Sequence, residues 1–213
     1  MSDAYEPTLD SFVMSEEELE AITAAMTDEH PWDVKNELVK SVKNKIRAHH
    51  LERHGDTCCY CRTNLHGGGH FMIDREHVLP KGKYKRFAYE IWNLSVSCKR
   101  CNMQFKIEDD EFVVDKQDGA EFQDSSNYRI VHPNYDEWEQ HLDRVSQQSN
   151  RKLLVIYAIV NQSEKGRYTY DYFGLKELEV NSFDEGQGIE RTAQGNRSDA
   201  ALEALAIARA HGQ

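Results

Sequence analysis

Five cysteines stand in two tight clusters, and four of them have the spacing of a zinc site. Cys58 and Cys61 form one C-x2-C pair, and Cys98 and Cys101 form a second pair after an interval of 36 residues. Each pair can place two thiolates on one side of a tetrahedral Zn²⁺. Cys59 is an alternative to Cys58, although it would give the less common C-x-C spacing. Four thiolates leave no open coordination position, so we expect this Zn²⁺ to be structural and any catalysis to come from other residues.

An acid, a histidine and an amide lie between and just after these cysteine pairs. His77 follows Glu76 directly, and Asn102 follows the second pair. Phosphodiester hydrolysis needs a deprotonated water and a cation that stabilises the developing charge. Imidazole suits the first task near neutral pH, and Mg²⁺ or Mn²⁺ accepts carboxylate and amide oxygens. Neighbours on an extended strand point to opposite faces, so Glu76 can bind the metal while His77 activates water. Asp74 is a rival to Glu76 as the metal ligand.

Charge is distributed unevenly along the chain. The formal net charge is −11, which taken alone argues against a protein that binds nucleic acid. Residues 32–106, however, carry 15 Lys or Arg and 7 Asp or Glu, whereas residues 1–31 carry nine acids and no Lys or Arg. A basic centre with acidic ends favours a polyanion-binding core with flanks of another role. The alternative is that basic and acidic helices merely balance each other.

The order of these motifs resembles the HNH endonucleases, in the subgroup with a zinc site beside the active centre. The matching pieces are "CCYC", "EHVLP", "WNL" and "CKRCNMQFK", which together span residues 55–108. Two features depart from the common pattern, because Glu76 stands where Asp is frequent and Asn102 stands where His is frequent. The resemblance implies a ββα-metal fold, in which two short antiparallel strands and a helix clasp one divalent metal ion.

The same resemblance assigns roles to individual residues. It implies that His77 is the general base, that Glu76 and Asn102 bind the catalytic Mg²⁺ or Mn²⁺, and that Asn93 holds His77 in orientation across the loop. It also implies a set of cationic groups that meet phosphates, with Lys106 counted in the active centre: Lys106, Lys81, Lys83, Lys85 and Arg86. The expected activity is metal-dependent cleavage of phosphodiester bonds, most readily in DNA, although the sequence leaves the choice between DNA and RNA open.

A second interpretation is a catalytically inactive, zinc-stabilised module that binds nucleic acid or a protein partner. Glu76, His77 and Asn102 discriminate between the two, because a degenerate module usually loses the base. All three are present, which favours the nuclease. The stretch "YRIVHPNYDEWEQHL" is similar to HNH nucleases of bacterial anti-phage systems such as Septu, where the nuclease partners an ATPase. This implies an ATPase or another defence-complex protein as a partner. The acidic N-terminal helix could bind such a partner, or it could mask the basic centre.

The elements that must position these residues can be read from periodicity and capping signals. Ser15 and Glu18 have capping-box spacing and predict a helix that ends near Met26. Apolar residues at helical spacing predict a second helix over 34–54. "FMID" and "WNLSVS" predict short strands on either side of the loop that contains residues 81–86, and "CKRCNMQFKIE" predicts a helix.

The remainder of the chain carries weaker signals. "YDEWEQHLDRV" predicts a helix, and "RKLLVIYAIV" with "GRYTYDYFG" predicts a hairpin. Residues 184–198 resemble a linker, and residues 198–210 predict a final amphipathic helix. We therefore expect an α+β protein with an acidic extension (1–31), a nuclease domain with its preceding basic helix (32–112) and a region of unassigned role (113–213). The longest apolar run, 153–160, is too short to span a bilayer, and no secretory signal is visible, so a cytoplasmic location is expected.

Overall fold

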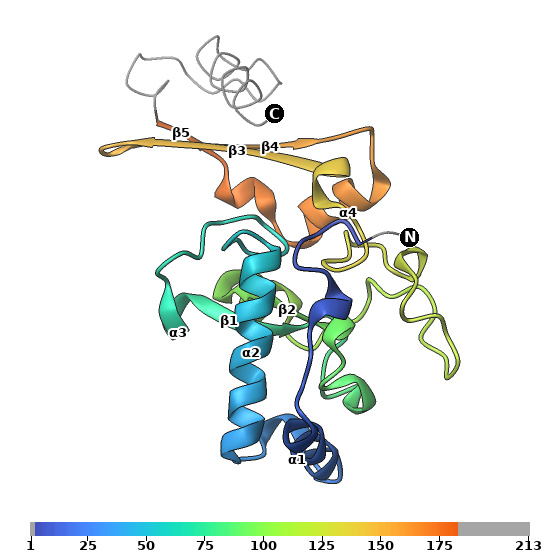
Figure 1. Cartoon of the computed structure of the whole chain (residues 1–213). Helices are drawn as coiled ribbons and strands as arrows, with labels where there is room; N and C mark the ends of the chain where they lie inside the picture. Colours follow the sequence, from blue (N-terminus) through green and yellow to red (C-terminus); the bar gives the residue numbers. More distant parts are fainter. Residues whose placement is uncertain (1–2, 183–213) are drawn as a thin grey trace. The chain divides into compact units, whose positions relative to one another are not determined.

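Two units make up the computed structural model, Met1–Trp138 and Glu139–Gln213, and the structure describes residues 3–182 (Figure 1). Each unit combines helices with a small antiparallel sheet, which confirms the predicted α+β class. The predicted linker and final helix lie outside the described residues. In the part of the chain that the structure describes, no helix is long and apolar enough to cross a membrane.

The first two helices form where the sequence predicts them. In α1 (Glu16–Met26), the Ser15 hydroxyl accepts from the Glu18 amide and the Glu18 carboxylate accepts from the Ser15 amide, so the capping box is complete. The second helix, α2 (Glu37–Arg53), starts a few residues later than predicted because the Asn36 side chain accepts two backbone amides of its first turn. Both predicted helices are therefore confirmed.

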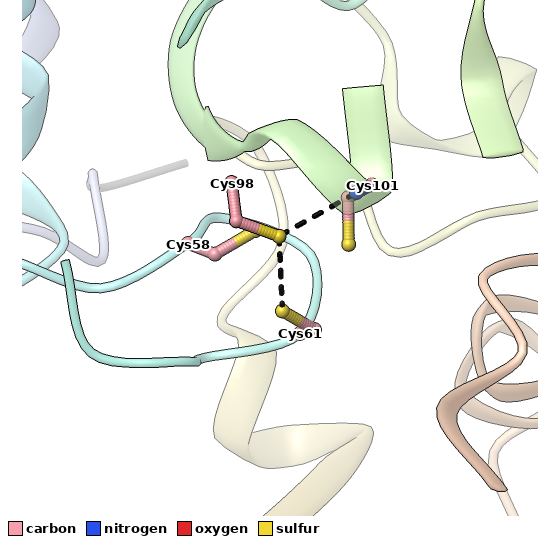
Figure 2. Close-up of side chains that lie close together, drawn as sticks. All are labelled: Cys58, Cys61, Cys98 and Cys101. Carbon is pink, nitrogen blue, oxygen red and sulfur yellow. Dashed lines mark hydrogen bonds between the residues drawn. The ribbon is translucent and has the colours of Figure 1, made fainter. Parts of the chain in front are cut away.

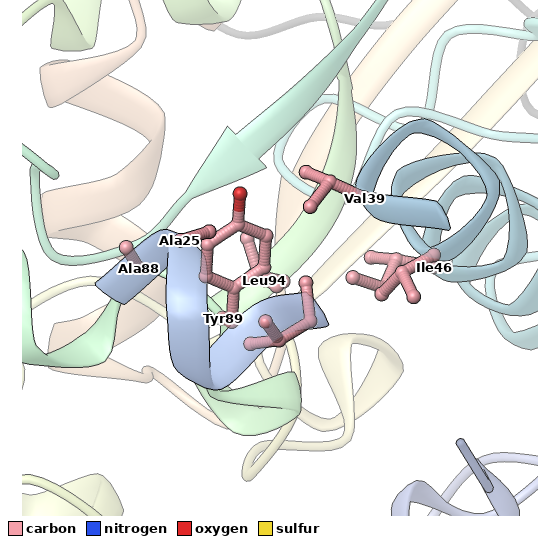
Figure 3. Close-up of a cluster of buried hydrophobic side chains, with 8 residues drawn as sticks. Ala25, Val39, Ile46, Ala88, Tyr89 and Leu94 are labelled. Carbon is pink, nitrogen blue, oxygen red and sulfur yellow. The ribbon is translucent and has the colours of Figure 1, made fainter. Parts of the chain in front are cut away.

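The core of the first unit lies where α1 and α2 pack against the chain that leads into the second strand (Figure 3). Lys45 of α2 also pairs with Glu18 of α1, with Nζ 2.6 Å from the carboxylate. The buried cluster consists of Ile22, Ala25, Val39, Val42, Ile46, Ala88, Tyr89 and Leu94. This packing fixes α2 beside β2 and the chain that leads into it, between the two motif segments that carry the predicted catalytic residues.

Two short antiparallel strands, β1 (Ile73–His77) and β2 (Leu94–Cys98), form the sheet of the first unit. The prediction that "FMID" forms a strand is wrong at its start, because α3 (Gly69–Met72) occupies that position. Phe71 is 93% exposed and Met72 is 48% exposed, so neither has a buried face that would hold it in the sheet. The strand that leads into the motif therefore begins at Ile73.

A π-helical turn, Arg100–Lys106, follows β2 where a helix is predicted. The Ile107 amide donates to the Asn102 carbonyl at 2.7 Å, which is a bond between residues five apart, and the turn ends where Ile107 adopts a φ of 49°. Loops then prevail, and Trp138 anchors their end by donating from its ring nitrogen to the Tyr60 carbonyl. Single 3-10 turns lie at Leu9–Ser11, Pro31–Asp33, Lys85–Phe87, Ile91–Asn93, Ser125–Asn127, Trp138–Gln140 and Leu175–Leu178.

The second unit contains a hairpin of β3 (Leu142–Ser149) and β4 (Lys152–Ile159), with a short third strand, β5 (Val180–Asn181), beside β4. The prediction of a helix over 135–145 is wrong. Leu142 faces Ile159 in the hairpin, and β4 offers a strand of equal length whose backbone groups pair with those of β3. This pairing overrides the local helical pattern.

Helix α4 (Glu164–Tyr172) replaces the predicted second strand of a hairpin. "RKLLVIYAIV" does form β4, but its partner is β3. The Ser163 hydroxyl accepts from the Gly166 amide at 2.9 Å and caps the helix. Tyr168 and Tyr172, one turn apart, stack with ring centroids 5.8 Å apart. The tyrosines that alternate in the sequence therefore lie on a helix, and the prediction of a strand here is wrong.

Candidate metal centre and catalytic cleft

The four cysteines of the two C-x2-C pairs come together in the first unit (Figure 2). Their sulfur atoms all lie within 4.8 Å of one another, and those of Cys61 and Cys98 are 3.7 Å apart. Two sulfurs bound at about 2.3 Å to one tetrahedral Zn²⁺ lie roughly 3.8 Å apart. Cys59 is buried outside this group, and its amide donates to the Val96 carbonyl. The predicted cluster is confirmed, and its geometry fits a metal ion such as zinc.

Backbone hydrogen bonds hold both cysteine pairs in place. The Cys58 amide donates to the Thr63 carbonyl, and the Arg62 amide donates to the Cys58 carbonyl, so the first pair sits in a tight turn. In the second pair, the Cys101 amide donates to the Cys98 sulfur at 3.4 Å. Hydrogen bonds from the other thiols, first that of Cys101, hold the pKa of Cys61 well below its usual range, whereas burial raises the pKa of Cys58. A thiolate at Cys61 favours a bound cation.

Residues from β1, the following loop and the π-helical turn line a cleft of about 410 Å³ in the first unit. His77, Asn102 and Lys106, three residues predicted for the active centre, all line it. Asp74, the rival ligand, lines it as well. Glu76 does not, because its side chain is enclosed behind the cleft surface. The structure therefore brings most of the predicted catalytic groups to one cavity.

His77 is held at the cleft by two neighbours. Its Nε2 lies 3.0 Å from the Ala88 carbonyl oxygen, which can only accept, so Nε2 carries the hydrogen and Nδ1 is left as the acceptor. Trp32 packs edge-on against the imidazole, with ring centroids 4.4 Å apart. Burial lowers the pKa of His77 to about 3. The ring is therefore neutral at neutral pH, which is the state a general base requires.

Asn93 ties together the two ends of the loop after β1. Its side-chain oxygen accepts from the Leu79 amide at 2.7 Å, and its Nδ2 donates to the carbonyls of Leu79 and Phe87. Phe87 precedes Ala88, whose carbonyl accepts from His77. Among the described residues, Asn93 forms no hydrogen bond with the imidazole itself. It fixes the backbone that in turn orients the ring.

Glu76 and Lys106 form a buried ion pair. The Lys106 ammonium lies 3.0 Å from Oε1 of Glu76, and the Tyr60 hydroxyl donates to the same oxygen at 3.0 Å. The other carboxylate oxygen, Oε2, is buried and has no hydrogen-bond partner among the described residues. Burial raises the pKa of Glu76, while the charge of Lys106 opposes that shift. Sequence reasoning missed Tyr60, because nothing in the motif spacing links it to Glu76.

Asp74 and Asn102 face each other at the cleft, as β1 passes the π-helical turn. Nδ2 of Asn102 lies 3.3 Å from Oδ2 of Asp74, and the Lys99 ammonium lies 2.8 Å from Oδ1. The Asp74 side chain is 21% exposed to solvent, whereas the Glu76 side chain is fully buried. Asp74 is thus the carboxylate that a ligand in the cleft can reach.

The basic loop, residues 81–86, is paired with acids that the sequence pattern did not connect to it. The distances from cation to carboxylate are 2.9 Å for Lys81–Asp33, 2.7 Å for Lys83–Asp110 and 2.7 Å for Arg86–Asp118. Lys81 lines the cleft, whereas Lys83, Lys85 and Arg86 line a separate hollow of about 460 Å³. The predicted phosphate contacts are therefore divided between two cavities, with Lys81 and Lys106 at the cleft and the other three at the separate hollow.

The chain is similar to Septu protein PtuB from Bacillus thuringiensis. The two are 27% identical over 137 residues, which make up 64% of this chain and 43% of that protein. The chain thus matches less than half the length of this curated relative. No family model and no solved structure matches it. The likeness supports the link to a Septu-type defence system that the sequence motifs suggest.

Proposed function

We propose that this chain is a metal-dependent endonuclease of the HNH type, which hydrolyses phosphodiester bonds in DNA within a Septu-type anti-phage complex. The observation that carries this proposal is the cleft, where a neutral histidine of fixed orientation lines the same wall as a carboxylate and an amide. That set of groups supplies a base and a place for a hard cation. The antiparallel β1 and β2 and the turn that follows them are consistent with a ββα-metal core.

In this proposal His77 accepts a proton from the attacking water at Nδ1. Nε2 is committed to the Ala88 carbonyl, and Asn93 holds that part of the loop by its bonds to Leu79 and Phe87. Trp32 covers one edge of the ring and limits its movement. The base is thus fixed before substrate arrives, which reduces the reorganisation needed at the reacting centre.

Asp74 and Asn102 are the groups we propose for the catalytic Mg²⁺ or Mn²⁺. Their oxygens suit a hard cation, they lie side by side, and Asp74 is accessible. A bound ion supplies positive charge that stabilises the transition state and the leaving oxygen. Glu76, for which the family resemblance implies this role, is paired with Lys106 and enclosed. We propose that the pair supports β1 against the π-helical turn from behind the cleft.

The cysteine cluster positions the turn that carries Asn102. Cys98 ends β2, and Cys101 belongs to the turn that carries Asn102. A Zn²⁺ bound to all four cysteines would tie that turn to the knuckle at residues 58–61. Its role would be structural, because four thiolates leave it no position for substrate.

Incubation of the purified full-length chain with supercoiled plasmid tests the proposal. We expect nicked or linear product that requires added Mg²⁺ or Mn²⁺, with or without a co-expressed ATPase partner. Single-stranded DNA and RNA of the same length serve as competing substrates and identify the preferred nucleic acid. Absence of cleavage of all three substrates, across metal concentrations and with the partner present, would contradict the proposal and favour the binding module.

A further inference from the structure

A basic surface separate from the basic loop (residues 81–86) lies along α2 and reaches the cleft through β1. Arg75 of β1 lines the cleft, and its guanidinium is fixed on α2 by two hydrogen bonds. Its Nε donates to the Lys43 carbonyl at 2.7 Å, and one terminal nitrogen donates to the Asn44 side chain at 2.6 Å. Arg47 lies one helical turn beyond Lys43, about 6 Å along the helix axis. We call Lys43, Arg47 and Arg75 the basic track.

No carboxylate forms a salt bridge with this track among the described residues, and the nearby charge of Asp33, which is itself bonded to Lys81, acts on Lys43 without a direct contact. By contrast, Lys81, Lys83 and Arg86 of the basic loop all form ion pairs with carboxylates. The Lys43 ammonium donates only to the Trp32 carbonyl. Nε of Arg47 is buried and has no hydrogen-bond partner among the described residues. Partly buried cations without a paired carboxylate are unfavourable in the free protein and favour an anionic ligand.

The three cations are close enough to affect each other. Burial lowers the pKa of Lys43, and the neighbouring charge of Arg75 lowers it further, while the charge of Asp33 opposes the shift. Burial and the charge of Arg47 likewise lower the pKa of Arg75. Like charges held together in this way gain most from a ligand with several negative charges in a row.

We propose that the basic track binds the phosphate backbone of the nucleic acid on one side of the cleavage site and leads it to His77. This inference rests on the proposed nuclease function, and it differs from the sequence prediction, which placed phosphate contacts in the basic loop. Arg75 connects the two regions, because it contacts α2 and lines the cleft. Guanidinium groups suit the bidentate binding of phosphate oxygens.

Salt-dependent binding of a fluorescent DNA duplex to the full-length protein, without divalent cations, tests this inference. The track variant replaces its three cations: Lys43→Gln, Arg47→Gln and Arg75→Gln. The loop variant makes the same change at three paired cations: Lys81→Gln, Lys83→Gln and Arg86→Gln. A charge-matched control uses cations of the second unit: Arg151→Gln, Lys152→Gln and Arg167→Gln. Arg47→Gln alone serves as the mildest variant, because the Arg47 side chain makes no hydrogen bond within the described residues.

Each phosphate contact contributes about 0.9 to the slope of log K against log salt. We expect the track variant to lose about 2–3 from that slope and Arg47→Gln to lose about 0.9, for all duplex sequences alike. The wild type should then lose roughly 40-fold more affinity than the track variant when salt rises from about 50 to 200 mM. The loop variant should change the slope less, and the control should match the wild type.

Two results would overturn the inference. If the track variant and Arg47→Gln keep the wild-type slope while the loop variant loses it, the basic loop binds the backbone and the track has another partner, such as an acidic protein. In that case plasmid cleavage would remain and the proposed function would stand. If the wild type binds no duplex, single strand or RNA at low salt, both the inference and the proposed function fail.

Discussion

The orientation of His77 depends on residues that are distant in sequence. The family resemblance implies that Asn93 bonds across the loop, and the structure shows its side chain bonded to Leu79 and Phe87. The packing of Trp32 against the imidazole had no signal in the motif, because Trp32 precedes α2 and lies 45 residues from His77 in the sequence. The sequence therefore predicted the groups at the cleft better than it predicted what holds them.

The two acids of β1 should respond differently to the loss of their charge. We expect Asp74→Asn to raise the Mg²⁺ or Mn²⁺ concentration needed for half-maximal cleavage. The change in stability should be small, since the Asp74–Lys99 pair is partly open to solvent and pairs at the surface contribute at most about 1 kcal/mol. Glu76→Gln should instead lower the free energy of unfolding by on the order of 3–5 kcal/mol, because it leaves the buried Lys106 ammonium without its counter-charge.

Metal titration of cleavage and urea denaturation of both variants would measure these effects. The two substitutions are matched, since each replaces a carboxylate with an amide of the same size. A higher metal requirement in Glu76→Gln, with stability like that of the wild type, would return the ligand role to Glu76.

At the scale of elements, the knuckle at residues 58–61 and the junction after β2 depend on each other through the cysteine cluster. Cys98→Ser should release the zinc and lower the melting temperature sharply, because structural zinc sites contribute on the order of 10 kcal/mol to folding. Cys59→Ser should retain the metal, because that sulfur lies outside the cluster. Metal analysis and thermal unfolding of the two serine variants provide the comparison. The assignment would be refuted if the two variants lost zinc and melting temperature to the same extent, or if the wild type contained no zinc.

The helices and strands of the first unit were more predictable than those of the second. The capping box of α1 and the apolar period of α2 are local signals, and the structure follows both. The pairing of β3 with β4 is not local, and the sequence alone suggested a helix for the first of these strands. For α4, Ser163 is a helix-capping residue and was a usable signal for a helix. The alternating tyrosines that follow it favoured a strand, and the prediction followed them. Strand pairing in particular depends on a partner that local patterns do not identify.

At the scale of the whole molecule, acidic residues within the basic centre and just after it pair with its cations. Asp33 precedes α2 and reaches Lys81, while Asp110 and Asp118 follow the motif and reach Lys83 and Arg86. The overall net charge of −11 therefore does not describe the surface near the cleft. Composition predicted a basic centre, but it could not predict which cations remain without a counter-charge, because that depends on the folded chain.

Buried histidines make the stability of the protein depend on pH. Burial, and secondarily neighbouring charges, lower the pKa values of His50 and His54 well below their usual range. As pH falls below about 6.5, the unfolded chain binds protons that the folded protein excludes, so the free energy of unfolding decreases. The slope should approach about 1.4 kcal/mol per pH unit for each histidine, and this contribution should be complete above that pH.

Urea denaturation at pH 7.5, 6.5 and 5.5, with metal content followed in parallel, would measure this slope. His66 is a matched control, because its side chain is 80% exposed and His66→Gln should leave the slope unchanged. Stability that is constant or increases as pH falls, with metal retained, would contradict the burial of His50 and His54.

The most direct test of the nuclease proposal is the rate of plasmid nicking by His77→Ala under single-turnover conditions, beside the wild type and His66→Ala. Loss of the general base should lower the rate by roughly 10²–10⁴-fold, whereas zinc content, melting temperature and DNA affinity stay near those of the wild type. His66→Ala should nick at the wild-type rate. Nicking by His77→Ala as fast as by the wild type would contradict the proposed mechanism and leave the binding module as the better account of this chain.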